Sequence, residues 1–83
     1  KLHLLPFALP MQVAIFSTKS YDRQFFEVAN FDHRHELIYL EPKLNEQTAS
    51  LASGCPAVCV FVNDTVNAAT LQILAANGTW LLA

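Results

Sequence analysis

Glycine, basic residues and long apolar runs are all scarce in this chain of 83 residues. Its two glycines, Gly54 and Gly78, lie too far apart to form a glycine-rich phosphate loop of either the dinucleotide-binding or the P-loop type. A formal charge of −2 provides no basic surplus for contacts with a phosphate backbone, so we expect no nucleic-acid partner. No apolar run approaches the roughly 20 residues of a membrane-spanning helix, so no membrane association is predicted.

The sequence does contain enough apolar residues for a folded core. Hydrophobic residues make up 53% of the chain, which is typical of a globular protein rather than a disordered one. The length fits one domain or a piece of a larger one. Residues 1–10 contain two prolines and no small-x-small cleavage pattern, so no signal peptide is predicted. We expect Met11 to be the natural start and residues 1–10 to be a non-native or upstream leader.

The two cysteines, Cys55 and Cys59, are interpreted as reduced thiols that pack like small apolar side chains. If one strand contains both, their α-carbons lie about 13 Å apart at about 3.3 Å per residue. Disulfides require less than about 7 Å. Cys-x-x-x-Cys without further ligands is also weak evidence for zinc. The sequence therefore predicts neither a disulfide nor a metal site, and a cytoplasmic location.

Apolar, β-branched runs alternate with helical patterns along the chain. Strands are expected at residues 12–16, 36–40, 57–62 and 80–83, and helices at residues 20–30, 45–54 and 67–77. In the first helix, the periodicity predicts an apolar face of Tyr21, Phe25 and Val28, with Ser20 as N-cap. Asn45 is the expected cap of the second helix. Glycines are well placed to end the second and third helices.

This alternation predicts an α/β fold. The expected architecture is a parallel β-α-β-α-β-α-β sheet with helices on both faces and right-handed crossovers. In such sheets, ligands bind at the carboxyl ends of the strands. Those ends are expected at residues 17–19, 41–43 and 63–65.

Other chemistries fit the residues less well. His33 and His35 precede the second expected strand, on the edge opposite the ligand crevice, and are interpreted as solvated residues of a connection; a metal or acid–base role stays open. A phosphoryl-receiving domain has the same alternation, with Asp64 in the acceptor position. That chemistry needs carboxylates after the first strand, and residues 17–20 contain none. No serine lies in a Gly-x-Ser-x-Gly elbow.

Three segments of the chain have amino-acid sequences that resemble those of a known protein family. They are residues 11–22 (MQVAIFSTKSYD), 54–64 (GCPAVCVFVND) and 77–83 (NGTWLLA). Residues 11–83 resemble, without an obvious gap, the amino-terminal part of the bacterial fermentative D-lactate dehydrogenases, which belong to the NAD-dependent D-isomer-specific 2-hydroxyacid dehydrogenases.

The resemblance implies that residues 11–83 form the amino-terminal part of a flavodoxin-like substrate-binding domain with an incomplete sheet. In that family the dinucleotide-binding domain and the catalytic Arg, Glu and His come later, and this chain contains none of those positions. The implied reaction of the intact enzyme is hydride transfer between NAD(H) and a 2-oxo acid such as pyruvate, giving D-lactate. We expect the chain alone to bind no cofactor and to be inactive.

One implied substrate contact falls inside the chain. In the family an aromatic residue at the end of the third strand faces the cleft, and Phe61 matches it. Asn63 and Asp64 continue this corner and are the other candidate cleft residues. The competing interpretation is a core phenylalanine followed by a capping turn.

Two classes of function therefore stay open. The first is a truncated piece of an oxidoreductase, whose partner is the remainder of the parent enzyme. The second is a free-standing small α/β interaction module without catalysis. The third expected helix carries no charge and the last strand is short, which favours the first class and predicts self-association through exposed apolar surface and strand edges.

Overall fold

A computed structural model describes residues 11–62 and 64–83 of the chain. The leader expected at residues 1–10 and the candidate residue Asn63 lie outside the described residues. The elements are β1 (Gln12–Ile15), α1 (Ser20–Asn30), β2 (Glu36–Tyr39), the 3-10 helix η1 (Ala49–Ala52), β3 (Ala57–Cys59), α2 (Ala68–Ala76) and β4 (Leu81–Leu82). The predicted alternation of strands and helices is confirmed, with a 3-10 helix in the place of the second α-helix.

The four strands form one parallel sheet in the order β2-β1-β3-β4. In the centre, Val13 of β1 lies opposite Leu37 of β2 and Ala57 of β3. This order matches the first four strands of the flavodoxin-like order 2-1-3-4-5. The chain runs outward from β1 in one direction to β2 and then returns to the other side of β1 for β3. The switch in strand order, where ligands collect in such sheets, therefore lies between β1 and β3.

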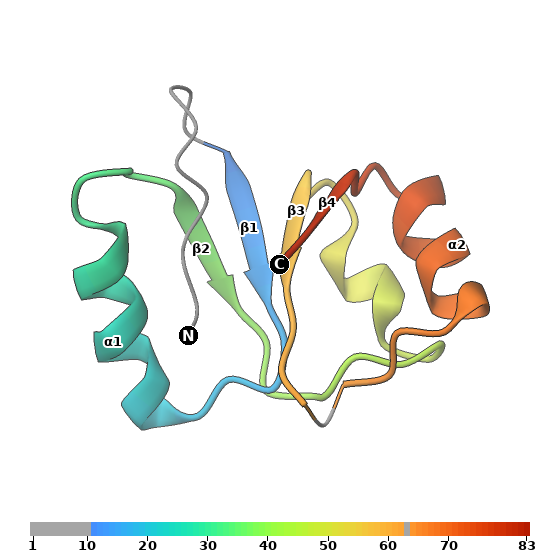
Figure 1. Cartoon of the computed structure of the whole chain (residues 1–83), viewed down its shortest axis with the longest axis horizontal. Coiled ribbons are helices and arrows are strands. Elements are labelled where there is room, and N and C mark those ends of the chain that lie inside the picture. The colour runs from blue at the N-terminus through green and yellow to red at the C-terminus, as the bar shows by residue number, and fades with distance from the viewer. Residues whose placement is uncertain (1–10, 63) are drawn as a thin grey trace.

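Side chains of β1 alternate between two separate cores. Val13 and Ile15 pack with Phe26 of α1, whereas Ala14 and the following residue Phe16 pack with Leu74 of α2 and with Ala49 and Ala52 of η1. Figure 1 shows α1 on one side of the sheet and α2 with η1 on the other. Both faces of β1 are thus covered, which explains why its sequence is apolar at successive positions rather than alternating. The predicted α/β architecture with helices on both faces is confirmed.

The predicted apolar face of α1 is wrong. Tyr21, Phe25 and Val28 are 77%, 55% and 72% exposed, whereas Phe26 is 1% exposed and Asn30 is also buried. The helix therefore docks through a stripe offset by one residue from the predicted one. In this position Phe26 packs against Val13 and Ile15 of β1 and Ala57 and Cys59 of β3, so its ring joins the core on this face of the sheet. The N-cap is Lys19 rather than Ser20, and the Lys19 N–H donates to Asp22 Oδ2 at 2.9 Å.

The start of the second helix and the end of β3 differ from the expectation, whereas the two ends of α2 agree with it. Asn45 accepts the backbone N–H groups of residues 47 and 48 and so caps a turn, not an α-helix, before η1 begins. The strand β3 ends at Cys59, three residues before its predicted end. By contrast, Asn67 caps α2 by accepting the Thr70 N–H at 2.9 Å, and Gly78 follows α2 with a φ of +100° that favours glycine.

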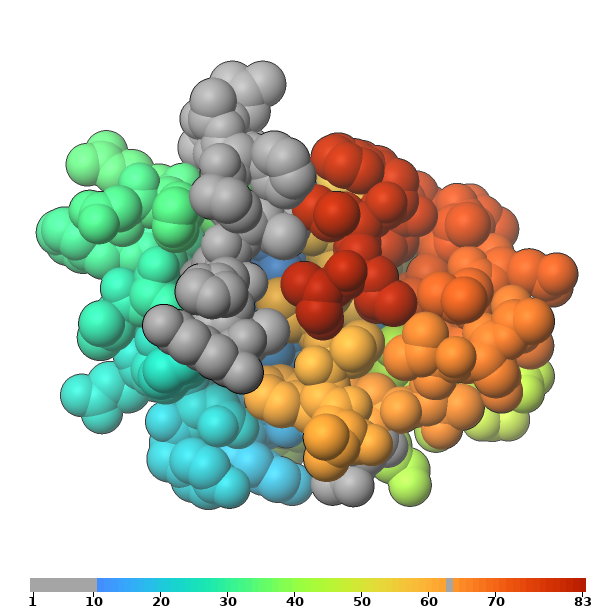
Figure 2. All heavy atoms as spheres, viewed as in Figure 1, coloured from blue at the N-terminus to red at the C-terminus, as the bar shows by residue number. Residues whose placement is uncertain are grey.

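The described residues also expose apolar surface. Figure 2 shows α1 and α2 at opposite ends of the molecule, and no other element covers the outer side of either helix in this view. The most exposed large apolar side chains outside α1 among the described residues are Val62, Phe31 and Trp80, at 99%, 78% and 66%. Self-association through such surface stays a prediction. Within residues 11–62 and 64–83, no helix is long and apolar enough to span a membrane.

Candidate functional site

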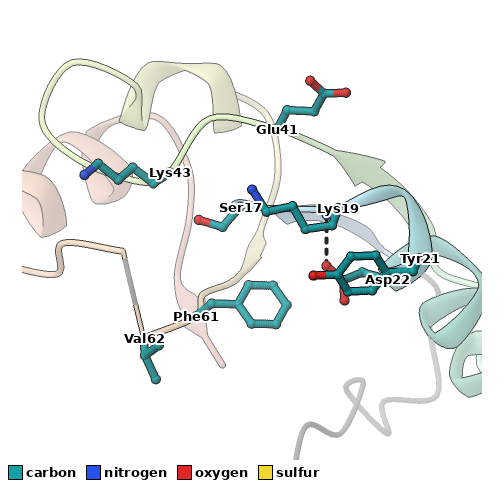
Figure 3. Close-up of a pocket in the computed structure, with 8 residues that line it drawn as sticks. All are labelled: Ser17, Lys19, Tyr21, Asp22, Glu41, Lys43, Phe61 and Val62. Atoms are coloured by element: carbon teal, nitrogen blue, oxygen red, sulfur yellow. Dashed lines mark hydrogen bonds between the residues drawn. The ribbon is translucent and has the colours of Figure 1, made fainter.

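The chain leaves β1, β2 and β3 at the same edge of the sheet, because the three strands are parallel. A hollow of about 440 Å³ opens there (Figure 3). Its lining comes from the three strand ends and from the first turn of α1: Ser17, Lys19, Tyr21, Asp22, Glu41, Lys43, Phe61 and Val62. The hollow is therefore built at the switch in strand order, where the fold predicts a binding site.

Charges of both signs surround an apolar wall in this hollow. Lys19 and Lys43 provide ammonium groups, while Asp22 and Glu41 provide carboxylates, one of which already accepts the Lys19 N–H. Neither histidine nor cysteine lines it within the described part of the chain, so its lining offers no side chain that ordinarily titrates near neutral pH. The arrangement can hold a small molecule with polar and apolar parts.

Asp64 accepts hydrogen bonds from residues that follow all three strands, although it does not itself line the hollow. Its Oδ1 accepts the Ser17 hydroxyl at 2.6 Å and the Leu44 N–H at 2.7 Å, and its Oδ2 accepts the Phe61 N–H at 2.7 Å. The three donors follow β1, β2 and β3. Hydrogen bonds to a carboxylate are short and stronger than those between neutral groups. Asp64 thus fixes the relative positions of the loops that form the hollow.

Ser17 adopts a conformation that a residue with a side chain rarely takes. Its φ is +59°, in the left-handed region, which costs an ordinary residue about 1–2 kcal/mol. The Ser17 N–H donates to the Pro42 carbonyl at 2.9 Å and its hydroxyl donates to Asp64. Since the N–H and the hydroxyl of Ser17 both donate to residues that follow neighbouring strands, these contacts hold the strained turn in place.

Phe61 has one side in the core and the other in the hollow. Its half-buried ring meets the Phe26 ring edge-on, with centroids 6.0 Å apart. Figure 3 shows it between Val62 and the turn that carries Tyr21 and Asp22. Phe61 is therefore a core aromatic residue and at the same time part of the lining of the hollow, so the two interpretations of this residue do not exclude each other. Contact with a substrate by Phe61, Asn63 or Asp64 stays a prediction.

Sequence reasoning located the strand ends at residues 17–19 and 41–43 but missed Tyr21 and Asp22. Both belong to α1, whose first turn lies beside the end of β1. A detectable signal was present in the sequence, because a helix that follows a parallel strand after a short connection places its first turn at that strand's carboxyl end. The helical periodicity instead predicts Tyr21 on the buried face of α1, which is why its place in the hollow was missed.

His33 and His35 lie at the amino end of the sheet, away from the hollow. The interpretation of His35 as a solvated residue is wrong: it is 4% exposed, its Nδ1 accepts the Met11 N–H at 3.1 Å, and its ring stacks on that of His33. Asn30 holds the His35 backbone, donating to its carbonyl at 2.6 Å and accepting its N–H at 2.9 Å. Among the described residues, no group of three or more His, Cys, Asp or Glu side chains could hold a metal ion.

Both cysteines are buried with free thiols, as their interpretation as apolar residues predicts. Burial raises the pKa of the Cys59 thiol to about 11. Burial also raises the pKa of Cys55, and the negative charge of Glu36 adds to this shift. A protonated, buried thiol is a poor nucleophile, so neither side chain is suited to covalent catalysis.

A second hollow, of about 390 Å³, lies between α2 and β4. Its lining is apolar apart from Thr79 and comprises Leu71, Leu74, Ala75, Thr79, Trp80, Leu81 and Leu82. The Thr79 hydroxyl already donates to the Cys55 carbonyl at 2.8 Å. This hollow offers no charged group to orient a polar ligand, so the hollow at the strand ends is the better candidate site.

No protein-family model matches the chain. Among curated proteins, it is 51% identical over 73 residues to 2-hydroxyacid dehydrogenase homolog 1 of Schizosaccharomyces pombe and 38% identical over 73 residues to D-lactate dehydrogenase of Escherichia coli. In both cases the match covers 88% of this chain and 22% of the relative. The chain thus spans about a fifth of the length of the curated relatives that it matches.

Solved structures agree with the sequence matches. The apo-structure of D-lactate dehydrogenase from Escherichia coli superimposes with a TM-score of 0.84 at 38% identity, over 87% of this chain and 23% of that one. The structure of Salmonella D-lactate dehydrogenase gives the same TM-score and identity, over 22% of its length. The chain is therefore homologous to the amino-terminal fifth or so of the D-2-hydroxyacid dehydrogenases, which include the D-lactate dehydrogenase of Escherichia coli.

Proposed function

We propose that residues 11–83 form the amino-terminal part of the substrate-binding domain of an NAD-dependent dehydrogenase that interconverts pyruvate and D-lactate. The observation that carries this proposal is the hollow at the ends of β1, β2 and β3, in a chain homologous to D-2-hydroxyacid dehydrogenases. In this role the hollow forms part of the wall of the substrate cleft. Phe61 is the residue that we expect to meet the substrate's apolar end.

The chemistry of the lining indicates which catalytic groups this chain provides and which the remainder of the enzyme provides. Hydride transfer to a 2-oxo acid requires the nicotinamide, a proton donor and a cation that binds the carboxylate. Within the described residues, the lining of the hollow contains no histidine, the side chain that most often transfers protons in catalysis. We infer that the remainder of the enzyme provides the coenzyme site and the catalytic Arg, Glu and His. The chain contributes shape and positioning to the cleft.

A chimaeric enzyme tests this proposal. Residues 11–83 would replace the aligned segment of Escherichia coli D-lactate dehydrogenase, and pyruvate-dependent oxidation of NADH would be followed by nicotinamide absorbance. We expect the chimaera to be active, and we expect Phe61→Ala within it to raise the KM for pyruvate by on the order of 10-fold, since the substitution removes one apolar wall of the cleft. Leu51→Ala is the matched control, because Leu51 is half-exposed on η1, outside the hollow.

Two results would overturn the proposal. One is a chimaera that unfolds cooperatively, like the parent enzyme, yet oxidises no NADH with pyruvate. The other is saturable NADH oxidation by the 83-residue chain alone, which would assign it the coenzyme and catalytic groups that we place elsewhere. If the chimaera is inactive and the isolated chain is monodisperse and cooperatively folded, the alternative of a small interaction module gains support.

A further inference from the structure

The Asp64 carboxylate accepts three hydrogen bonds from residues that follow three different strands. Its two oxygens accept one hydroxyl and two backbone N–H groups, all at 2.6–2.7 Å. Two backbone bonds strengthen the same junction: the Asp64 N–H donates to the Phe61 carbonyl at 2.9 Å, and the Thr65 N–H donates to the Leu44 carbonyl at 2.8 Å. Asp64 is therefore the point at which the chain segments after β1, β2 and β3 meet.

These bonds also explain the local backbone. The Phe61 N–H lies just beyond the end of β3, where no neighbouring strand is paired with it. The Leu44 N–H lies in the connection from β2 to η1, and Leu44 itself is fully buried. A buried N–H without a partner costs about 1–3 kcal/mol. The carboxylate satisfies both N–H groups and the hydroxyl of the strained residue Ser17.

A carboxylate used in this way has little capacity left for a ligand. Ionised aspartate is an acceptor only, and three of its strong acceptor directions point at protein donors. Asp64 also does not line the hollow, whereas Ser17 and Phe61, which it holds, both do. The geometry thus separates Asp64 from Phe61, although the sequence placed both in one group of candidate cleft residues.

We propose that Asp64 is a positioning residue, which acts on the substrate through Phe61 rather than by touching it. Its carboxylate holds the Phe61 backbone, and through it the ring, at the wall of the hollow, and it locks the turn at Ser17 against the same point. This inference rests on the proposed function, because the hollow must be a substrate cleft for the position of Phe61 to matter.

Asp64→Asn in the chimaera is the decisive variant. The amide retains one acceptor oxygen, which can keep the bonds from Ser17 and Leu44, but its NH₂ group then faces the Phe61 N–H and cannot accept it. We expect the KM for pyruvate to rise by on the order of 10-fold, with kcat lowered by less than about 3-fold. A merely structural role would instead lower the active fraction, and hence the apparent kcat, without changing KM.

Asp32→Asn provides the matched control. It makes the same chemical change at an exposed aspartate outside the hollow, so KM should stay within about 2-fold of the parent value. If the unsubstituted chimaera is active and Asp64→Asn leaves KM unchanged, the positioning role is overturned and the proposed function stands.

A second measurement decides the role of Asp64 even if the chimaera is inactive and the proposed function fails. Amide hydrogen exchange by NMR on the 83-residue chain should show faster exchange at Phe61 in Asp64→Asn, by on the order of 10-fold, and no such change in Asp32→Asn. Equal exchange at Phe61 in the parent chain and in Asp64→Asn would show that the carboxylate does not hold this residue.

Discussion

The Phe61 ring meets the Phe26 ring edge-on, with centroids 6.0 Å apart and ring planes at 76°. This contact joins the wall of the hollow to the core beneath α1, since Phe26 is fully buried and Phe61 lines the hollow. Edge-to-face aromatic pairs of this kind contribute about 0.5–1.5 kcal/mol beyond the area that they bury. The position of α1 on the sheet and the shape of the candidate site are therefore coupled through two side chains.

Neighbouring phenylalanines on α1 should differ sharply in their contribution to stability. Phe26→Ala removes a buried ring and should lower the free energy of unfolding by about 3–5 kcal/mol. Phe25→Ala removes a ring that is 55% exposed and should lower it by less than about 1 kcal/mol. Urea denaturation followed by circular dichroism measures both. Similar losses for the two variants would mean that α1 is rotated from the position described.

Asn30 should make a large contribution to the free energy of unfolding for a side chain of its size. Its buried side chain forms hydrogen bonds with both the N–H and the carbonyl of His35. Asn30→Ala leaves an N–H and a carbonyl without these partners and should lower the free energy of unfolding by about 2–4 kcal/mol. Gln24→Ala on the exposed side of the same helix is the control and should change it by less than about 0.5 kcal/mol. A loss below about 1 kcal/mol for Asn30→Ala in chemical denaturation would contradict the pairing.

Thr70 offers a stabilising substitution. It is fully buried in α2, and among the described residues its hydroxyl has no hydrogen-bond partner. Thr70→Val replaces the hydroxyl by a methyl group of similar shape and should raise the free energy of unfolding by about 1 kcal/mol. Thr79→Val is the matched control: it removes a hydroxyl that donates to the Cys55 carbonyl at 2.8 Å, so it should be destabilising by about 1–2 kcal/mol. Thermal unfolding of the two variants should thus show shifts of opposite sign.

The Cys59 thiol should make stability depend on pH in the alkaline range. Burial raises its pKa from 9.0 to about 11, so the folded state favours the protonated thiol. This contribution is fully present below pH 9 and is lost as the pH rises through 11, by an amount of about 2–3 kcal/mol. Cys59→Ala should lose less stability than the parent chain between pH 8 and pH 11 when both are unfolded in urea. Parallel losses for the two chains, or rapid alkylation of Cys59 in the folded chain at pH 8, would contradict its burial as a thiol.

Local patterns in the sequence predicted most of the fold. Asn67 and Gly78 bracket α2 because a cap and a left-handed residue act within one turn of the helix that they bound. The apolar run of β1 predicted a strand covered on both faces, and both of its faces are covered. The second helix was less predictable: the Asn45 turn takes up its first residues, and only η1 remains.

The errors arose where two local patterns compete. Tyr21, Phe25 and Val28 have helical spacing, but so do Phe26, Ala29 and Asn30 at positions i, i+3 and i+4. In the second stripe Phe26 and Asn30 are buried and Ala29 is half-buried. Periodicity cannot choose between such stripes, since it contains no information on how the helix is rotated about its axis against the sheet. His35 was misplaced for the same kind of reason, because its polar neighbours in sequence do not reveal that Asn30 and Met11 enclose it.

By itself, the sequence determined the order of the elements, the parallel sheet and the edge at which a site should lie, because these follow from interactions between residues a few positions apart. Only the tertiary structure decided what each side chain does at that edge. Ser17 and Asp64 are 47 positions apart, and their hydrogen bond exists because β1 and β3 are neighbours in the sheet. Sequence reasoning could place Phe61 and Asp64 in the same corner, but only the packing of three strand ends separates the residue at the wall of the hollow from the residue that holds it there.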